Sequence, residues 1–378
     1  MNQEAPSTKP VNRQAFIDHI RVFLTALVIA HHAAVTYGAS GNWFCKEVQS
    51  SELGEGTNLF FTMLVSVDQS FFMGMFFLIA GYFTPKSLER KGTARFIGER
   101  LLRLGLPLVF FLTVLFQLTV AISAPYLGHS FGGVWKWLYQ NPSYTPGPLW
   151  FVQTLLIFAF LYAIWNKLRR QSAAPEAESP LPRHRTLFLA ALGVGLCSFL
   201  VRQWMPAGDS VAGMQLGYFP PYILLFFTGC AAARHKWLER IDWRYARPWV
   251  FLSLLLAVSL PFIAGSCPDG SAFSGGMNRY ALTYALWDPF ISWGIMLGLL
   301  FAVRRFLNGT NAFVQALARA SYATYIIHAT VLVATSVALR GWTAAPVMKW
   351  AAVSAIAVCA SFALSAILVR IPGIKKVI

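Results

Sequence analysis

Ten apolar stretches dominate this sequence, and each has the length of a membrane-crossing helix. An α-helix needs about 20 predominantly apolar residues to cross the hydrocarbon core of a bilayer. The chain is 56% hydrophobic and only 12% charged, which is more apolar than a soluble domain can bury. The sequence therefore predicts an all-α fold, a polytopic membrane helical bundle of about ten transmembrane helices. The stretches cover residues 16–38, 58–83, 104–124, 149–166, 187–204, 216–233, 248–265, 281–303, 317–339 and 346–369.

The distribution of basic residues predicts which side of the membrane each connection faces. The formal net charge is +16, and connections on the N-terminal side hold 24 of the 31 Lys and Arg residues. Connections on the other side hold six, and Arg21 lies inside the first apolar stretch. Because short cytoplasmic loops are enriched in positive charge, we expect both termini to be cytoplasmic, in a bacterial inner membrane. The basicity then reflects topology and contact with membrane lipids, and we expect no nucleic acid as a partner.

One membrane domain accounts for most of the chain. We expect residues 1–15 to form a cytoplasmic N-terminal tail, 16–370 a single transmembrane domain, and 371–378 a cytoplasmic C-terminal tail. The segment 171–182 is rich in Pro, Ala, Ser and Glu, which is typical of a flexible loop. The aromatic, Gly-rich and Pro-rich segment 125–148 predicts a structured cap or re-entrant loop at the opposite interface.

Two further features of the connections leave alternatives open. Segment 84–103 mixes six cations with apolar side chains, which is typical either of an interfacial amphipathic helix leading into the third span or of an ordinary positive-inside loop. Cys45 and Cys267 both fall on the predicted outer side. They form a disulfide only if that compartment is oxidising.

The first apolar stretch carries an arginine, Arg21, and two adjacent histidines, His31 and His32. Ionisable groups inside a span are costly and by default mark a functional site. Eleven helical steps of about 100° bring Arg21 and His32 to the same face, roughly 16 Å apart along the axis, whereas His31 points about 80° away. We therefore expect Arg21 and His32 to line one polar stripe. Asp18, three residues before Arg21, is placed to pair with it; an interfacial anchor and an interhelical hydrogen bond are the structural alternatives for Arg21 and His32.

Further ionisable side chains inside apolar stretches include Asp68, Asp288 and His328. Asp68 needs a partner or water, and His328 lies deep within its stretch. Asp288 precedes a proline, so a helix-start cap is as good an interpretation as a functional carboxylate. We expect no metal, because the sequence has no HExxH and no Cys/His set at ligand spacing. The sequence also has no P-loop motif and no GxSxG nucleophile elbow, whereas GIMLG at 294–298 matches the GxxxG pattern of helix packing.

Five motifs occur in a fixed order along the chain. They are an Arg, ten residues and a His in IDHIRVFLTALVIAHH, then FFLIAGYF at 76–83, RLLRLGLP at 100–107, LWFVQTLLIF at 149–158 and SYATYIIH at 321–328. This set resembles the acyltransferase-3 family of ten-helix membrane acyltransferases. Within that family, HHAAVTYG, GYFTPKSLERKG and YFPPYILLFFTGC most resemble the branch that modifies periplasmic glucans with succinyl groups.

The resemblance implies an enzyme that transfers acyl groups other than amino-acyl groups. The donor would be cytoplasmic acyl-CoA, with no permanently bound cofactor, and the acceptor a hydroxyl of a periplasmic or cell-surface glycan that receives a succinyl or acetyl group. Arg100 and Arg103 would bind the donor phosphates as planar cationic forks. His32 would act as the general base, since an imidazole has an ordinary pKa of about 6.5, and Arg21 would orient the donor or balance developing negative charge.

The remaining polar residues leave the mechanism and the function class open. Attack by the acceptor is direct or passes through an acyl-histidine intermediate, with Asp18, Asp68, Asp288 and His328 as supporting candidates. A proton-coupled transporter or flippase would instead use the intramembrane Asp and His residues as a relay, although no inverted repeat is visible. A structural or lipid-binding assembly protein would tolerate substitutions at Arg21 and His32. Turnover of an acyl thioester separates the first class from the other two.

Overall fold

A computed structural model describes residues 15–141, 145–168, 179–267 and 270–377, and its long regular elements are helices. Ten helical segments in these ranges are long and apolar enough to cross a membrane, which confirms the predicted all-α bundle. Residues 1–14 of the predicted tail and most of the 171–182 loop lie outside the described residues. The spanning segments are α1 (Ala15–Thr36), α2 (Glu55–Lys91), Thr93–Tyr126, Gly147–Leu168 with α7 (Trp150–Leu168), α8 (His184–Val201), Leu216–His235 with α9 (Phe219–His235), α10 (Trp243–Gly265), α11 (Arg279–Phe306), α12 (Ala312–Ala338) and α13 (Pro346–Leu368).

The third span is one continuous helix with two wider turns. It contains α3 (Thr93–Arg100), α4 (Leu106–Phe110) and α5 (Phe116–Ser123), which are joined by π-helical turns over Leu101–Gly105 and Phe111–Leu115. The first wide turn lies directly before Pro107, whose missing N–H and bulky ring interrupt regular α-helical bonding.

The segment 84–103, expected to form either an interfacial amphipathic helix or a positive-inside loop, is divided between two spans. Residues up to Lys91 belong to the end of α2, and Gly92, with φ of +73°, separates them from α3. Because a positive φ at this position favours glycine, the chain turns here rather than continuing as one helix. Arg100 and Arg103 consequently lie at the start of the third span.

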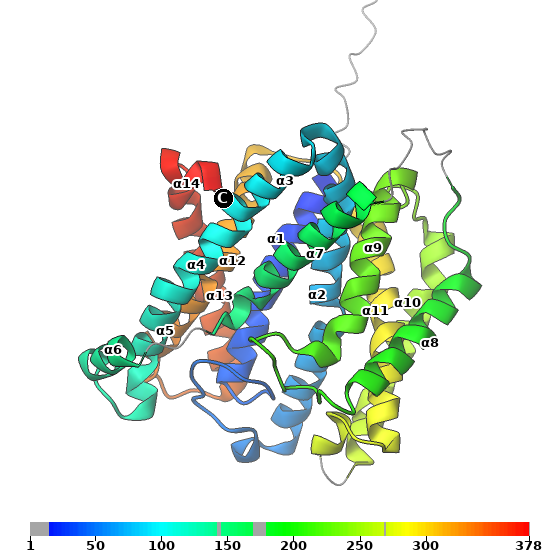
Figure 1. Ribbon diagram of the computed structural model, residues 1–378. Coiled ribbons are helices and arrows are strands. Elements are labelled where there is room, and N and C mark those ends of the chain that lie inside the picture. Colours follow the sequence, from blue (N-terminus) through cyan, green and yellow to red (C-terminus); the bar gives the residue numbers. More distant parts are fainter. Residues whose placement is uncertain (1–14, 142–144, 169–178, 268–269, 378) are drawn as a thin grey trace, which may run out of the picture.

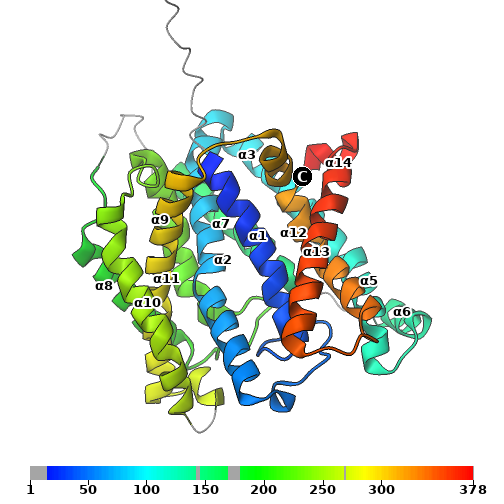
Figure 2. The ribbon, with the colours of Figure 1, turned by 180° about the vertical axis from the view of Figure 1, so that it is seen from behind.

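The helices form two groups on either side of a central set (Figures 1 and 2). The central helices are α1, α2 and α7; α8 to α11 pack on one side, and α5, α12 and α13 on the other. The start of α1 and the last helix, α14 (Pro372–Val377), lie at the same end of the bundle, which we call the N-terminal end. The segment 371–378, predicted as a tail, thus contains a helix that packs against the turn Leu101–Gly105.

Two close helix contacts depend on glycine. A Cβ atom at Gly81 of α2 would lie 2.0 Å from the carbonyl oxygen of Phe226 in α9, and one at Gly294 of α11 would lie 2.1 Å from that of Trp249 in α10. Small residues let helix backbones approach in a membrane, where apolar burial does not drive association. The GxxxG match at 294–298 is therefore part of the α10–α11 interface.

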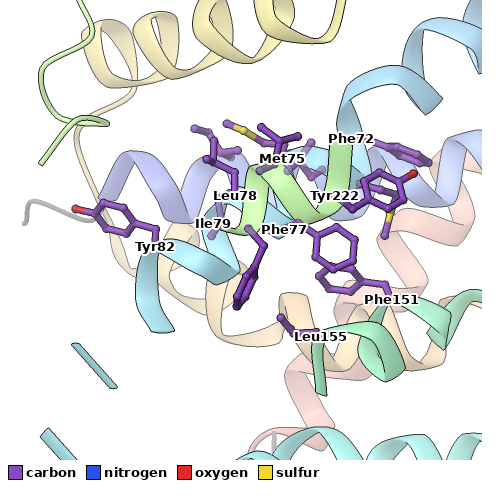
Figure 3. Close-up of a cluster of buried hydrophobic side chains, with 14 of the residues drawn as sticks. Phe72, Met75, Phe77, Leu78, Ile79, Tyr82, Phe151, Leu155 and Tyr222 are labelled. Atoms are coloured by element: carbon purple, nitrogen blue, oxygen red, sulfur yellow. The ribbon is translucent and has the colours of Figure 1, made fainter. Parts of the chain in front are cut away.

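Aromatic side chains fix the centre of the bundle. Figure 3 shows Phe77 of α2 among Phe151 of α7 and Tyr222 of α9, with ring centroids 4.7 Å and 5.0 Å from that of Phe77. Aromatic pairs at these separations add stabilisation beyond the area that they bury. This packing holds α2, α7 and α9 together at the level of the polar residues described below.

Within the predicted structured cap at 125–148, residues 131–140 form a short helix at the edge of the bundle. This helix, α6 (Phe131–Gln140), packs on α5 and exposes Trp135, Trp137 and Tyr139 (Figure 1). Exposed Trp and Tyr are typical of the membrane–water interface. The aromatic residues of α6 line neither of the two cavities described below.

Candidate functional site

Two cavities enter the bundle and share one side chain. The first, the basic cavity, has a volume of about 1110 Å³ and is lined by six cations: Arg21, Arg100, Arg103, Arg319, Arg370 and Lys375. The second, the aromatic cavity, has a volume of about 520 Å³ and is lined by His31, His32 and many aromatic rings. Tyr325 lines both. The two cavities therefore approach each other at Tyr325.

The basic cavity lies at the N-terminal end of the bundle. Arg21 pairs with Asp18 at 3.4 Å, as the spacing of three residues predicted. Both side chains are about one-third exposed, at 34% and 39%, so the pair contributes little stability and leaves the guanidinium accessible. Asp18 is the one carboxylate among the described residues that line this cavity.

Arg100 and Arg103 enter the basic cavity from the start of the third span. The guanidinium of Arg100 lies 5.0 Å from the ring centre of Phe96, a cation–π contact that orients it. The carbonyl of Arg103 accepts a hydrogen bond of 2.6 Å from the Tyr322 hydroxyl of α12. The turn that carries both arginines is thus fixed to α12.

The aromatic cavity brings together rings from six spans, α12 with Tyr325 included. Phe72, Trp150, Tyr218, Tyr222, Tyr284 and Trp287 line it, together with the two histidines. Gln69 of α2 donates to the Tyr222 hydroxyl at 3.3 Å. The cavity therefore offers flat apolar faces together with hydroxyl and amide groups, which is how small polar ligands are oriented in proteins.

His32 belongs to a group of three nearly parallel rings. Its imidazole stacks on the indole of Trp43 with centroids 4.0 Å apart, and on the imidazole of His328 at 5.6 Å. His328 donates from Nδ1 to the Tyr325 carbonyl at 2.6 Å, which fixes its tautomer because a carbonyl only accepts. Nε2 of His328 then has no proton, and it has no hydrogen-bond partner among the described residues.

His31 and Asp68 form a second polar pair beside His32. His31 Nδ1 lies 3.6 Å from Asp68 Oδ2, and both side chains are about nine-tenths buried. The His31 ring meets that of His32 edge-on, with centroids 5.6 Å apart. Asp68 therefore has the partner that its position in the apolar run required, and its negative charge lies one side chain away from His32.

Asp288 is not a helix-start cap. It lies in the middle of α11, whose N-cap is Asn278, and its carboxylate lies 3.6 Å from Nη2 of Arg202. Arg202 is fully buried between the rings of Tyr218 and Tyr284, at 4.9 Å and 5.0 Å. The cap alternative is wrong because the helix begins two turns earlier, and the carboxylate instead neutralises a buried guanidinium behind the aromatic cavity.

The connection between α1 and α2 is also fixed in place. Glu47 forms an ion pair with Lys349 of α13, and the Tyr126 hydroxyl donates to Glu47 at 2.7 Å. Cys45 in the same connection is buried, and burial raises the pKa of its thiol to about 12. Neither Cys45 nor Cys267 is joined in a disulfide.

The structure separates some of the predicted site residues and groups others. Arg21 and His32 were expected to line one stripe, but Arg21 lines the basic cavity and His32 the aromatic cavity. Arg100, Arg103 and Asp18 accompany Arg21, whereas His328 and the His31–Asp68 pair accompany His32. Among the described residues, no group of three or more His, Cys, Asp or Glu side chains could hold a metal ion.

Sequence reasoning missed Trp43, Arg202, Glu47 and Lys349. Arg202 and Lys349 were counted only as charges on the outer side of the membrane. Their partners come from segments 86 and 302 residues away, so no local pattern identifies them. Trp43 lies in a short connection whose path was not predictable.

Comparison with known proteins gives a family and a distant likeness. The family described as acyltransferase domain matches residues 14–370. Three curated relatives, each named glucans biosynthesis protein C and from Escherichia coli strains K12, K12/DH10B and K12/MC4100/BW2952, are 31% identical over 100 residues. The alignment covers 26% of this chain and 24% of each relative, so it spans about a quarter of their length. No solved structure matches the chain.

Proposed function

The chain belongs to the acyltransferase-3 family, and we propose that it moves a succinyl or acetyl group from acyl-CoA in the basic cavity to a glycan hydroxyl in the aromatic cavity. As a multi-pass membrane acyltransferase, it takes an acyl group from a donor and gives it to an acceptor. The observation that carries the proposal is the meeting of the two cavities at Tyr325, whose ring centroid lies 5.5 Å from that of His328. In this proposal the donor occupies one cavity, the acceptor occupies the other, and the two react near Tyr325.

The charge of the basic cavity supports acyl-CoA as the donor. Coenzyme A carries a pyrophosphate and a further phosphate, and Arg100 and Arg103 offer planar forks that match phosphate oxygens. A cavity lined by one sign of charge also concentrates ligands of the opposite sign. The positive-inside distribution of Lys and Arg favours a cytoplasmic position for this cavity, in a bacterial inner membrane.

The aromatic cavity supports a sugar acceptor. The flat rings of Trp150, Tyr222 and Tyr284 suit the apolar faces of a sugar, and the Gln69 amide and tyrosine hydroxyls suit its hydroxyl groups. The name of the distant relatives, glucans biosynthesis protein C, agrees with an acceptor of this class. The exposed rings of α6, in the aromatic connection 125–148, do not line this cavity.

The proposed reaction centres on His32. Its imidazole takes the proton of the acceptor hydroxyl while the hydroxyl oxygen attacks the thioester carbonyl carbon. The carbon–sulfur bond breaks, and the proton passes from His32 to the departing thiolate of coenzyme A. Arg21, which lines the basic cavity, would orient the donor. Transfer through an acyl-histidine intermediate needs the same residue and the same two cavities.

Release of free coenzyme A by purified protein tests the proposal. We would supply acetyl-, succinyl- and longer acyl-CoAs with a glycan acceptor and compare the parent with His32→Ala, which should lose activity about 10²- to 10⁴-fold. His19→Ala is the matched control, because His19 bonds to the Gly309 carbonyl outside both cavities. Full transfer by a folded His32→Ala protein would remove His32 from the mechanism.

A second pair of variants tests the donor site. Arg100→Ala with Arg103→Ala should raise the donor KM about 10- to 100-fold and leave kcat within a few fold. Arg95→Ala is the control, since Arg95 pairs with Glu99 and does not line the cavity. If no acyl-CoA supports release by the folded parent with glycan present, acyl-CoA is not the donor.

A further inference from the structure

We propose that the basic cavity binds two anionic groups of its donor at different places. Arg319, Arg370 and Lys375 form a separate subsite for the 3′-phosphate of coenzyme A. This inference rests on the proposed function, because it assigns part of the same donor. Coenzyme A carries its pyrophosphate and its ribose 3′-phosphate at different positions of the nucleotide. A site that binds both needs cations on more than one wall.

The six cations of the basic cavity lie on different walls. Arg100 and Arg103 come from α3 and the wide turn after it, and Arg21 comes from α1. Arg319 comes from α12, Arg370 directly follows α13, and Lys375 is in α14. In Figure 2, α14 lies at the N-terminal end, beside the upper parts of α12 and α13. The cavity therefore has a first cationic wall at the third span and a second at the C-terminal helices.

The two walls are held at a fixed separation. Tyr322, one turn after Arg319, donates to the carbonyl of Arg103 at 2.6 Å. At the same place, α14 packs against the turn Leu101–Gly105. Because both contacts join the C-terminal helices to the arginine-bearing turn, the cations of the second wall have a defined position relative to Arg103. A defined separation suits a ligand with two phosphates on a rigid sugar.

The charge of the cavity exceeds what one pyrophosphate would need. Asp18 is the one carboxylate that lines it among the described residues, and this side chain pairs with Arg21. No ion pair is recorded for Arg103, Arg319, Arg370 or Lys375 in the described parts of the chain. Several cations facing one space without counter-charge strongly favour a multivalent anion. The 3′-phosphate is a monoester that carries up to two negative charges, which fits an arginine fork with a lysine point charge.

A phosphate of a membrane lipid has the same chemistry. Cations at a cytoplasmic interface bind anionic headgroups without any specific site, and Lys376 next to Lys375 could serve in this way. The geometry favours the donor, because the residues of the second wall face the same space as Tyr325 and the buried side chains of Leu104 and Val152. That space extends into the bundle, whereas a headgroup would remain at its surface.

The test compares acetyl- or succinyl-CoA, whichever the parent turns over, with the same thioester of 3′-dephospho-CoA. We expect the parent to bind the phosphorylated donor about 10- to 100-fold more tightly. The double variant Arg370→Ala/Lys375→Ala should bring this ratio close to one, mainly by weakening binding of the phosphorylated donor. The Arg100→Ala/Arg103→Ala variant should weaken the binding of both donors and leave the ratio of their affinities unchanged. Lys376→Ala, which does not line the cavity, is the matched control.

Direct binding of CoA and 3′-dephospho-CoA by calorimetry separates this inference from the proposed function. A preference for CoA that disappears in Arg370→Ala/Lys375→Ala supports the subsite even if no thioester is turned over. Turnover with equal affinity for the two donors, or a preference that the double variant retains, overturns the subsite and leaves the acyltransferase assignment in place. Loss of co-purified phosphatidylglycerol in the double variant, with no donor preference in the parent, would assign these cations to lipid instead.

Discussion

The imidazole of His32 lies stacked on the indole of Trp43, with ring centroids 4.0 Å apart and ring planes 12° apart. His32 is on α1, whereas Trp43 is in the connection to α2. That connection is fixed by the Glu47–Lys349 ion pair and by the Tyr126 hydroxyl. The orientation of the proposed base thus depends on contacts between the first connection and α13 at the far end of the chain.

Trp43→Ala should lower kcat about 10- to 100-fold, because a base displaced by about 1 Å loses that much rate. The donor KM should change little, since Trp43 does not line the basic cavity. Steady-state kinetics of coenzyme A release measure both quantities. Trp43→Phe keeps a stacking ring and should retain most of the activity. Trp135→Ala, in the exposed helix α6, is the control, and an equal loss in this variant would point to a general effect of removing indoles.

The His31–Asp68 pair gives a second prediction. When His32 accepts a proton, it becomes a cation beside two other imidazoles, and the Asp68 carboxylate, 3.6 Å from His31, favours that charge. Asp68→Asn keeps the shape but removes the charge, so kcat should fall about tenfold or more while the donor KM stays constant. His31→Gln/Asp68→Asn should be no worse than the more damaging single variant, because the two act as one unit.

Asp242→Ser is the control for charge removal. Asp242 caps α10 by accepting from the Tyr245 N–H, and serine preserves such a cap. Strictly additive losses in the His31 and Asp68 variants would show that the pair does not act through a shared interaction with His32.

The spans could be predicted from the sequence because each depends on a local property. Apolar length and the positions of Lys and Arg define a membrane helix without reference to the rest of the fold. The ten predicted stretches therefore agree with the ten helical segments to within a few residues at most ends. The main difference lies at 84–103, where α2 continues to Lys91 and ends at Gly92, and the residues after Gly92 belong to the third span.

The candidate site was only partly predictable, because its geometry joins segments far apart in the chain. Helical periodicity placed Arg21 and His32 on one face of α1, but side chains of other helices complete two separate cavities, and Arg21 lines one of them and His32 the other. Arg202 was counted as a loop charge, and only its contact with α11 shows it to be a buried partner of Asp288. Such pairings are tertiary, and a single sequence does not show them.

The α10–α11 interface should be sensitive to one methyl group. A Cβ at Gly294 would lie 2.1 Å from the Trp249 carbonyl oxygen, so Gly294→Ala should destabilise the fold by about 1–3 kcal/mol. Gly193→Ala in α8 is the matched control, because nothing lies within 4 Å of its added Cβ and alanine is the better helix former. Thermal midpoints measured in one detergent should fall for the first variant and stay equal or rise for the second. If both variants kept the thermal midpoint of the parent, α10 and α11 would accommodate the added methyl group without loss of stability.

Cys45 should resist alkylation in the folded protein. Burial raises the pKa of its thiol to about 12, and since the thiolate is the reactive form, about one molecule in ten thousand is reactive at pH 8. The stability contributed by the protonated thiol is present below the unfolded pKa of about 8.5 and declines as the pH rises toward the folded value. After alkylation at pH 8, mass spectrometry should find Cys45 modified only when the protein has been unfolded. No reductant should be needed for this modification. A requirement for reductant after unfolding would reveal the disulfide that the structure lacks.

Tyr325 should decide whether the acyl group reaches an acceptor or water. Its hydroxyl donates to the Pro148 carbonyl, and its ring lies near those of Phe76, Phe151 and His328, between the two cavities. Tyr325→Ala removes this partition, so water from the acceptor side would reach the thioester. We expect acyl-CoA hydrolysis without an acceptor to rise about tenfold relative to transfer.

The conservative variant Tyr325→Phe separates the ring from its hydrogen bond. It keeps the aromatic partition and loses only the bond to Pro148, so hydrolysis should rise by at most a few fold. Release of coenzyme A and formation of acylated glycan, measured in the same reaction, give the ratio directly. If a folded Tyr325→Ala protein showed the same ratio of hydrolysis to glycan acylation as the parent, another group would have to separate donor from acceptor. Because Tyr325 is the side chain common to both cavities, that result would also remove the reason for placing the reaction between them.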